Sequence, residues 1–338
     1  MQFKKLGRSG LFVSDITLGT MTFGDDGPKG TSEAESIDII HKYLDAGGNH
    51  LDTANGYNAG RSEEIIGKAL KGKRDEVLIA TKVNFPITAD DGINGKGLSR
   101  HNIIRGVEAS LRRLETDYID LYYMHAQDIL TPIDESLRAF DDLVRMGKVR
   151  YIGVSNFMAW RLMKALATSD GRGLERFVAA QYQYSLVKRE IEYEFVPLFE
   201  EEGLGLMPWG PLGGGFLTGK YKRGQRPTEA DGRIGSHPAH SEEAWNRRNT
   251  DKNWDIIDTL GSIAEERNAS YAQIALAWIR AQKTVTSVII GARTMKQLDD
   301  NLGAATIDLT AEELEQLEAV STPPELYPYR FLGAYARK

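Results

Sequence analysis

The run VLIATKV at residues 77–83, followed by YIDLYYMH at 118–125 and VRYIGVS at 149–155, decides the fold class. Each run is almost continuously apolar, which is typical of parallel strands that are buried on both faces. Five further runs have the same character: DITLGT (15–20), HLDTA (50–54), VAAQYQY (178–184), LGLMPW (204–209) and TSVIIG (286–291). Together they predict eight buried strands.

Segments with helical spacing separate these runs. The pair Thr131–Pro132, for example, predicts the N-cap and first residue of a helix that ends at Gly147. Eight strands that alternate with helices predict an α/β fold, a single (β/α)₈ TIM barrel domain over residues 1–338. A doubly wound sheet is the alternative, but its first strand usually leads into a G-x-G-x-x-G turn, and LGTMTFG at 18–24 has none.

Three segments fall outside the strand–helix repeat. KKLGRSGLFVS at 4–14 predicts an N-terminal β-hairpin that plugs the N-terminal end of the barrel. The polar stretch GQRPTEADGRIGSHPAHSEE at 224–243 predicts a long mobile loop between strands seven and eight. Whether residues 225–245 become ordered when a cofactor binds is left open. The C-terminal stretch TPPELYPYRFLGAY at 322–335 is a candidate to cover the mouth of the barrel.

Composition restricts the class of function. Basic and acidic residues number 42 and 48, and without a basic cluster we expect no nucleic-acid partner. The chain has no cysteine, which excludes disulfides and thiolate nucleophiles. The start MQFKKLGRSG has no apolar segment and no long apolar run follows, so we expect a cytoplasmic protein without a membrane partner. No H-x-H or H-E-x-x-H spacing occurs at a strand end, so we expect no metal site.

Polar side chains occupy three consecutive predicted strand ends: Asp52 with Tyr57 shortly after it, then Lys82, then His125. In barrel enzymes the active site lies at this end of the strands. We expect the Lys82 ammonium, held by Asp52, to lower the pKa of the Tyr57 phenol. A neutral His125 would orient a carbonyl oxygen. This chemistry suits protonation of an oxygen while a hydride reaches the carbon.

Other interpretations of these four residues exist. Asp52 and Lys82 could be a structural ion pair, Tyr57 a packing or surface residue, and His125 a core histidine. We do not expect all four such roles together at neighbouring strand ends. A Schiff-base aldolase would use Lys82 as the nucleophile. That enzyme needs a lowered lysine pKa, whereas a nearby carboxylate raises it.

LDTANGYNAGRSEEIIGKAL (51–70), ATKV (80–83), YIDLYYMH and VRYIGVSN (149–156) resemble the aldo-keto reductases, and the resemblance extends from residue 4 to residue 302. It implies a catalytic tetrad of Asp52, Tyr57, Lys82 and His125, with Tyr57 as general acid in carbonyl reduction and base in the reverse reaction. It further implies NADP(H) and a small-molecule aldehyde or ketone substrate. The potassium-channel β subunits in this superfamily make a cofactor-bound regulatory or redox-sensing subunit the alternative.

The resemblance also assigns the cofactor site. Ser155, Asn156 and Gln181 would bind the nicotinamide carboxamide, and Trp209 would stack on the ring. A Gly-rich loop with Lys220 would meet the pyrophosphate, and Arg293 the 2′-phosphate. Some relatives have arginine where Gln297 stands, which leaves the strength of the NADP preference open. The implied cofactor contacts are Gly19, Thr20, Met21, Asp52, Ser155, Asn156, Gln181, Trp209, Gly210, Pro211, Leu212, Gly214, Leu217, Lys220, Gly291, Arg293, Gln297 and Asn301.

The sequence is less informative about the substrate itself. Met21, Phe23, Phe85 and Trp209 follow strand ends and are candidates for an apolar pocket, although packing explains them equally well. Neither the identity of the carbonyl compound nor the oligomeric state follows from the residues.

Overall fold

The computed structural model describes residues 1–25, 27, 30–88, 90–236 and 238–335. Eight parallel strands form one curved sheet in the order β10-β3-β4-β5-β6-β7-β8-β9. The strands are β3 (Ile16–Gly19), β4 (His50–Asp52), β5 (Leu78–Val83), β6 (Ile119–Met124), β7 (Val149–Ser155), β8 (Phe177–Gln181), β9 (Gly205–Leu206) and β10 (Val288–Gly291). All eight predicted strands are confirmed, most of them shorter than the apolar run that predicted them.

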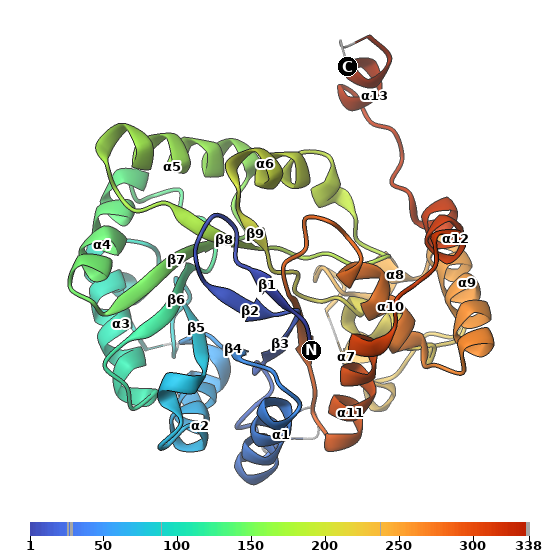
Figure 1. The fold of residues 1–338 in the computed structure, drawn as a ribbon, viewed down its shortest axis with the longest axis horizontal. Coiled ribbons are helices and arrows are strands. Elements are labelled where there is room, and N and C mark those ends of the chain that lie inside the picture. The colour runs from blue at the N-terminus through green and yellow to red at the C-terminus, as the bar shows by residue number, and fades with distance from the viewer. Residues whose placement is uncertain (26, 28–29, 89, 237, 336–338) are drawn as a thin grey trace.

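The two outer strands of this sheet approach each other and bring it round into a barrel. At the end of β9, the Leu206 carbonyl accepts from the Thr286 amide at 2.9 Å, and two residues on, the Pro208 carbonyl accepts from the Ile289 amide at 3.0 Å. These bonds join β9 to β10, so neither strand is left with an open edge. The predicted TIM barrel is therefore confirmed (Figure 1).

Helices surround the strands and cover their outer apolar faces (Figure 1). They are α1 (Glu33–Asp45), α2 (Arg61–Ala69), α3 (Arg100–Arg113), α4 (Ile133–Arg145), α5 (Ala159–Arg172), α6 (Phe195–Glu202), α9 (Asp251–Arg267), α10 (Tyr271–Arg280), α11 (Met295–Gly303) and α12 (Ala311–Ser321). The predicted cap of α4 is wrong by one residue, since Pro132 takes the N-cap position. The Thr131 hydroxyl instead donates to Asp128 Oδ2 at 2.6 Å.

The N-terminal hairpin closes one end of the barrel, as predicted. Strands β1 (Phe3–Lys5) and β2 (Phe12–Ser14) pair antiparallel. Leu6 and Val13 are fully buried and pack against inward-facing side chains of the barrel: Ala80, Leu121, Tyr123, Ala179, Met207 and Ile289. Gly7 has φ +54°, and a Cβ there would stand 2.4 Å from the Val178 carbonyl, so the turn fits only glycine. The floor of the barrel is thus a packed apolar layer.

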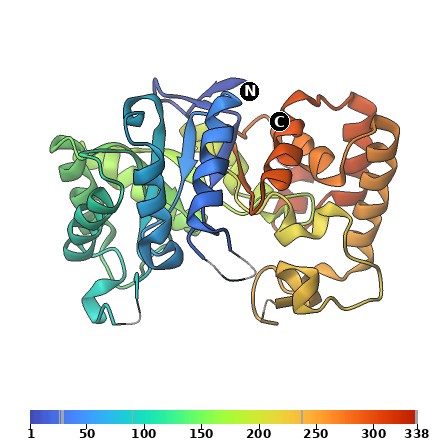
Figure 2. The ribbon, with the colours of Figure 1, turned by 90° about the horizontal axis from the view of Figure 1, so that it is seen from below.

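The first part of the long segment between β9 and β10, before α9, lies at the opposite end of the barrel from the hairpin (Figure 2). The predicted long loop is confirmed, but the stretch 224–243 contains the short helices η6 (Glu229–Asp231) and α7 (Arg233–Ser236). The turn η5 (Gly213–Thr218) precedes it, and α8 (Trp245–Arg248) follows it. Ile234 is 1 % exposed, which fixes α7 to the body of the protein. Residue 237 of the predicted loop lies outside the described residues, and the loop's mobility stays a prediction.

The C-terminal segment does not cover the mouth. Helix α13 (Tyr329–Tyr335) projects beyond the ring of helices (Figure 1). The ring of Tyr329 stacks on that of Tyr193 at 4.9 Å, and its hydroxyl donates to Glu194 at 2.9 Å. These contacts hold the segment on the outside of the barrel, next to the start of α6. Among the described residues, no helix is long and apolar enough to cross a bilayer.

Candidate active site

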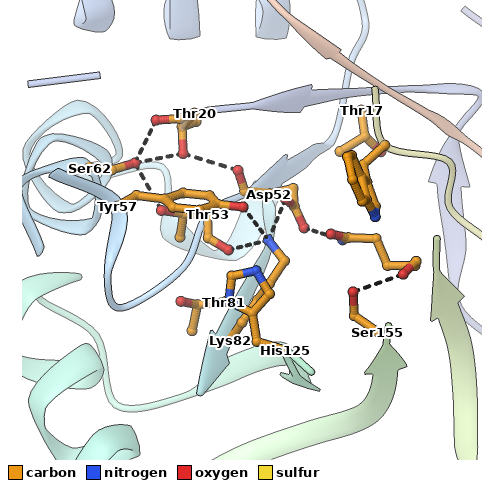
Figure 3. Close-up of polar contacts among 12 residues, drawn as sticks. Thr17, Thr20, Asp52, Thr53, Tyr57, Ser62, Thr81, Lys82, His125 and Ser155 are labelled. Atoms are coloured by element: carbon orange, nitrogen blue, oxygen red, sulfur yellow. Dashed lines mark hydrogen bonds and ion pairs between the residues drawn. The ribbon is translucent and has the colours of Figure 1, made fainter. Parts of the chain in front are cut away.

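The carboxyl ends of β4, β5 and β6 place the predicted tetrad in one cluster. Asp52 is the last residue of β4, Lys82 lies one residue before the end of β5, and His125 directly follows β6. Tyr57 opens a short 3₁₀ turn, η1 (Tyr57–Gly60), between β4 and α2. Because the three strands are parallel neighbours, their ends meet, and Figure 3 shows the four side chains converging.

The ammonium of Lys82 is the centre of this cluster. Its Nζ donates to Asp52 Oδ1 at 2.6 Å, to the Thr53 carbonyl at 2.6 Å and to the Tyr57 hydroxyl at 3.4 Å. An ammonium group has three protons, so these three oxygens satisfy it completely. The side chain is fully buried, so its position is fixed.

The turn that carries Tyr57 has an unusual backbone. Asn58 and Ala59 adopt left-handed conformations, with φ +46° and +54°. Such conformations are uncommon for residues other than glycine and often occur at functional sites. The Asn58 amide compensates by donating to the carbonyls of Met21 at 3.1 Å and Phe23 at 2.7 Å. The loop after β3 therefore holds the tyrosine turn in place.

A second contact joins this turn to the barrel through Ser62, at the start of α2. Its hydroxyl lies 2.7 Å from that of Thr20 and 2.9 Å from that of Thr53. The Thr20 hydroxyl also donates to the Asp52 carbonyl at 3.0 Å. Thr20, a predicted cofactor contact, therefore uses its side chain to connect β3, β4 and α2.

The charges around Lys82 and Tyr57 agree with the expected charged lysine but correct the expected pKa of the tyrosine. Burial alone would lower the pKa of Lys82, but the carboxylate of Asp52 and the phenol of Tyr57 more than offset burial and raise it. The lysine therefore stays charged, which disfavours an amine nucleophile. The prediction that Lys82 and Asp52 lower the pKa of Tyr57 is wrong in its net direction.

The pKa of Tyr57 is raised because the loss of solvent around the phenol outweighs the other effects. The Lys82 ammonium lowers it, as predicted, whereas the negative charge of Asp52 raises it. The phenol consequently keeps its proton at neutral pH. This is the state that a general acid needs before the reaction, and the ammonium stabilises the phenolate as it forms.

His125 is a neutral imidazole in contact with the tyrosine. Burial, assisted by the Lys82 charge, holds the pKa of His125 well below its usual range. Its ring lies edge-on to Tyr57 at 5.9 Å and to Phe85 at 4.8 Å. Among the described residues its Nδ1 has no hydrogen-bond partner although it is buried.

The predicted nicotinamide residues lie next to the tetrad and form one hydrogen-bonded chain. Gln181 Nε2 donates to Asp52 Oδ2 at 2.7 Å, so Asp52 contacts both groups. The Asn156 amide donates to Ser155 Oγ at 2.8 Å, and its oxygen accepts from Trp209 Nε1 at 3.3 Å. The Ser155 hydroxyl in turn donates to the Gln181 carbonyl at 2.8 Å. Asn156, like Asn58, has a positive φ, of +55°.

The Gly-rich stretch 210–221 follows β9 at the same end of the barrel. Gly213, Gly214 and Gly215 have φ of +57°, +72° and +90°, so three successive residues need the freedom of glycine. A Cβ at Gly215 would stand 3.4 Å from Lys220 Nζ, which places this ammonium beside the loop. Backbone N–H groups in such turns form concave anion sites.

Lys220 and Arg293 form the expected pair of cations. Burial and the positive charge of Arg293 lower the pKa of Lys220, while Asp231 acts in the opposite sense. These two positive charges, one beside the Gly-rich loop and one just before α11, repel each other. An anion bound between them would offset that repulsion. Helix α11 also begins here, with Thr294 as its N-cap.

Other predicted cofactor contacts have structural partners. The Gln297 side chain accepts from the Arg293 amide at 2.9 Å, and Asn301 donates to the Gly291 carbonyl at 3.1 Å. Leu217 is fully buried in the core. The remaining predicted positions lie at or after the strand ends: Gly19 is the last residue of β3, Met21 follows it, and Gly210, Pro211, Leu212 and Gly214 follow β9.

Sequence reasoning missed two residues of the 224–243 segment that reach this site. The guanidinium of Arg233 is close enough to lower the pKa of Tyr57. Its Nε lies 3.4 Å from Glu243 Oε2, and a Cβ at Gly214 would meet Glu243 at 3.1 Å. The isolated apolar residue Ile234, within an otherwise polar stretch, was the available sign that part of this loop packs. No group of three or more His, Asp or Glu side chains in the described part of the chain could hold a metal ion.

Comparison with known proteins agrees with this geometry. The model of the Aldo/keto reductase family matches residues 15–322. An uncharacterized oxidoreductase of Bacillus subtilis, YrpG, is 41% identical over 333 residues, which cover 96% of this chain and 97% of the relative. A probable voltage-gated potassium channel subunit beta of Oryza sativa is 37% identical and covers 98% of this chain and 100% of the relative.

A third relative has a named reaction. Norsolorinic acid reductase of Aspergillus flavus is 33% identical over 335 residues, 96% of this chain and 82% of the relative. The matches span the barrel and every strand end that carries a tetrad residue. From the closed barrel, the strand-end cluster and these matches together, we conclude that the chain belongs to the aldo/keto reductase family.

Proposed function

We propose that this protein reduces an aldehyde or ketone to an alcohol with hydride from NADPH. Tyr57 is the general acid, Lys82 and Asp52 control its charge, and His125 orients the carbonyl. The observation that carries the proposal is the Lys82 ammonium, which is fully buried and donates to both Asp52 and Tyr57. The family match supports an oxidoreductase of this general kind.

The reaction needs a proton for the carbonyl oxygen and a positive charge that stabilises the phenolate left on Tyr57. When bound, NADPH supplies the hydride to the carbonyl carbon. The Tyr57 hydroxyl gives its proton to the oxygen, and the phenolate left behind lies 3.4 Å from the Lys82 ammonium. Since Asp52 keeps the lysine charged, this stabilisation is present before the reaction begins. The neutral His125 donates one hydrogen bond from its N–H to the same oxygen.

The residues present fit a nicotinamide dinucleotide. Ser155, Asn156 and Gln181 offer a hydroxyl and two amides within one hydrogen-bonded chain, which suits a carboxamide with its donor and acceptor. Trp209 is tied to this chain through Asn156 and supplies an aromatic face. The three positive-φ glycines at 213–215 provide backbone N–H groups for a pyrophosphate.

Arg293 is the cation that would favour NADPH over NADH. The positive charge of Arg293 lowers the pKa of Lys220, so a bound phosphate group would stabilise both cations. The start of α11 lies next to Arg293 and adds its dipole. The 2′-phosphate is the group that distinguishes the two coenzymes.

A direct test measures the loss of reduced-nicotinamide absorbance when a simple aryl aldehyde is added with NADPH. The wild-type protein should show turnover, and Tyr57→Phe should abolish it, because the ring remains and only the proton donor is lost. Tyr327→Phe, at an 82 % exposed tyrosine, is the matched control and should keep full activity. Turnover in Tyr57→Phe at the wild-type rate would contradict the assignment.

A second candidate is a cofactor-bound regulatory subunit with little turnover. The match to the potassium channel subunit beta of Oryza sativa over 98% of this chain favours it. NADPH that exchanges slowly, with no aldehyde in a broad panel reduced above background, would support this alternative. The hydrogen-bonded tetrad supports turnover instead.

The proposal includes a single catalytic domain over residues 1–338 in the cytoplasm. The family match over residues 15–322 supports one domain, and the lack of cysteine means that no disulfide is needed for folding. Limited proteolysis that released a stable fragment lacking a tetrad residue would contradict the single domain.

A further inference from the structure

Helix α13 presents apolar side chains to solvent. Tyr335 is 75 % exposed, Phe331 55 % and Leu332 51 %. These three residues lie on one side of the helix, because residues three and four positions apart are neighbours on a helical surface. The rings of Phe331 and Tyr335 contact each other at 4.8 Å. We call Phe331, Leu332 and Tyr335 the α13 face.

The contacts of α13 with its own chain leave this face open. The helix is anchored through Tyr329, whose ring stacks on that of Tyr193 and whose hydroxyl donates to Glu194. It has seven residues, and none of them is buried. A helix this short is not stable in water without a surface to pack on. The α13 face therefore needs a partner beyond the anchor at Tyr329.

Helix α5 presents a second apolar surface on the outside of the ring of helices. Trp160 is 61 % and Met163 39 % exposed, and Ala167 and Gly171 are exposed on the next two turns. Their spacing of three to four residues places all four on one side of the helix, while the opposite side of α5 is buried in the core. We call these four residues the α5 face.

An open hollow lies along the α5 face. Its volume is about 420 Å³, and its lining includes Ala167 and Gly171 of α5 and Pro132 and Ile133 at the start of α4. A Cβ at Gly171 would meet no atom within 4 Å, so nothing fills the hollow at that point. Aromatic side chains that anchor protein contacts commonly insert into pockets of this kind.

The two faces lie on the same side of the molecule, with α6 between them (Figure 1). The contacts of Tyr329 with Tyr193 and Glu194 keep α13 next to the start of α6, so it does not reach α5 of its own chain. A two-fold axis beside α6 would bring α13 of each copy to α5 of the other. Two-fold dimers are the commonest oligomers of soluble proteins.

The charges beside the two faces are complementary. Arg330, in α13, is exposed and has no ion-pair partner among the residues that the structure describes. Asp170, next to Gly171 in α5, pairs through Oδ2 with Arg176, and its side chain is still 52 % exposed. A carboxylate has a second oxygen, which can accept from another guanidinium. Asp170 can therefore bind Arg330 of a second copy.

We propose that two copies of this chain form a two-fold dimer in which the α13 face of each copy packs on the α5 face of the other. Phe331 and Tyr335 enter the hollow beside α5, and Arg330 pairs with Asp170 across the contact. Connected apolar surfaces of this kind mark contacts between proteins. The inference is independent of the proposed reductase function.

Analytical ultracentrifugation over a range of protein concentrations tests the dimer. The wild-type protein should dimerise and dissociate on dilution, because two short helical contacts bury less surface than a permanent interface. Phe331→Asp and Met163→Asp should each raise the dimer dissociation constant by roughly thirtyfold or more, because a charge replaces an apolar contact. Ile93→Asp, at an 80 % exposed residue between β5 and α3, is the matched control and should leave the constant unchanged.

A charge exchange tests which faces meet. Arg330→Glu and Asp170→Lys should each raise the dissociation constant by roughly tenfold, because each places like charges together at both contacts. An equal mixture of the two variants should restore the wild-type constant. In the mixed dimer the new carboxylate of one copy meets the new ammonium of the other, and the native pair forms at the second contact.

A wild-type protein that stays monomeric at every concentration would overturn the proposal. A dimer that Phe331→Asp and Met163→Asp leave intact would overturn it as well, since that dimer would use another surface. If both charge variants dissociate but their mixture does not reassociate, α13 does not meet α5 and the proposed pairing is wrong.

Discussion

Asp52→Asn should make aldehyde reduction depend on pH in a way that reveals the charge of Lys82. In the wild-type protein burial alone would lower the pKa of Lys82, and the Asp52 carboxylate overcomes that effect. Without the carboxylate, burial dominates and the lysine pKa falls. At low pH the ammonium is still charged and assists Tyr57; as pH rises through the depressed lysine pKa, this assistance is lost.

The size of the loss follows from the Lys82–Tyr57 distance. At 3.4 Å, an ammonium and a phenolate attract each other by about 5 kcal/mol at an effective dielectric constant of about 20. If about half of the phenolate charge has developed in the transition state, about 2.5 kcal/mol is lost, which corresponds to roughly a 60-fold slower reaction. Asp52→Asn should fall from near the wild-type rate at low pH toward this limit at high pH.

Lys82→Met defines the limit, because it removes the ammonium at every pH. It leaves Asp52 without its cation, but burial raises the pKa of Asp52, so the carboxyl can take up a proton in place of an uncompensated charge. The assay is kcat/KM for an aryl aldehyde with saturating NADPH, from roughly pH 6 to 10. An Asp52→Asn profile parallel to the wild type, or a loss below about fivefold in Lys82→Met, would refute the reasoning.

Three further predictions concern the barrel and the coenzyme. Gly153→Ala should lower the free energy of unfolding by about 1–3 kcal/mol in urea, because its Cβ would stand 2.4 Å from the ring of buried Tyr123; equal stability would contradict the packing. Leu6→Ala should cost about 2–5 kcal/mol in the same assay, since Leu6 is fully buried in the floor, and a cost within error of zero would show that the hairpin is dispensable. Arg293→Ala should weaken NADPH binding by about 1.5–3 kcal/mol and NADH binding much less, which calorimetry can compare; equal losses would place Arg293 away from the 2′-phosphate.

The sequence predicted the barrel because strand burial leaves a strong local pattern. A parallel strand covered on both faces, such as Leu78–Val83, must be apolar throughout, and the polar residue at its end then stands out. Lys82 and His125 were recognisable for that reason. The closure of the barrel was not visible locally, since β9 is two residues long and is joined to β10 through the carbonyls of Leu206 and Pro208.

The residues of the site could be predicted from the sequence, but the direction of the Tyr57 pKa shift could not. Whether the pKa of Tyr57 rises or falls depends on how much solvent surrounds the phenol, and no spacing along the chain contains that information. The bond between Gln181 and Asp52 joins residues 129 positions apart. Arg233 was missed because its segment has the composition of an irregular loop, and only the tertiary contact of Ile234 gives it a defined place.

The two oxygens of Asp52 face different halves of the chemistry, one toward Lys82 and the other toward Gln181. An altered coenzyme ring that drew the Gln181 amide away from Asp52 would also change how strongly the carboxylate binds Lys82. Efforts to re-engineer this protein for an artificial hydride donor would therefore perturb its acid as well, and compensating changes should be sought around that single carboxylate.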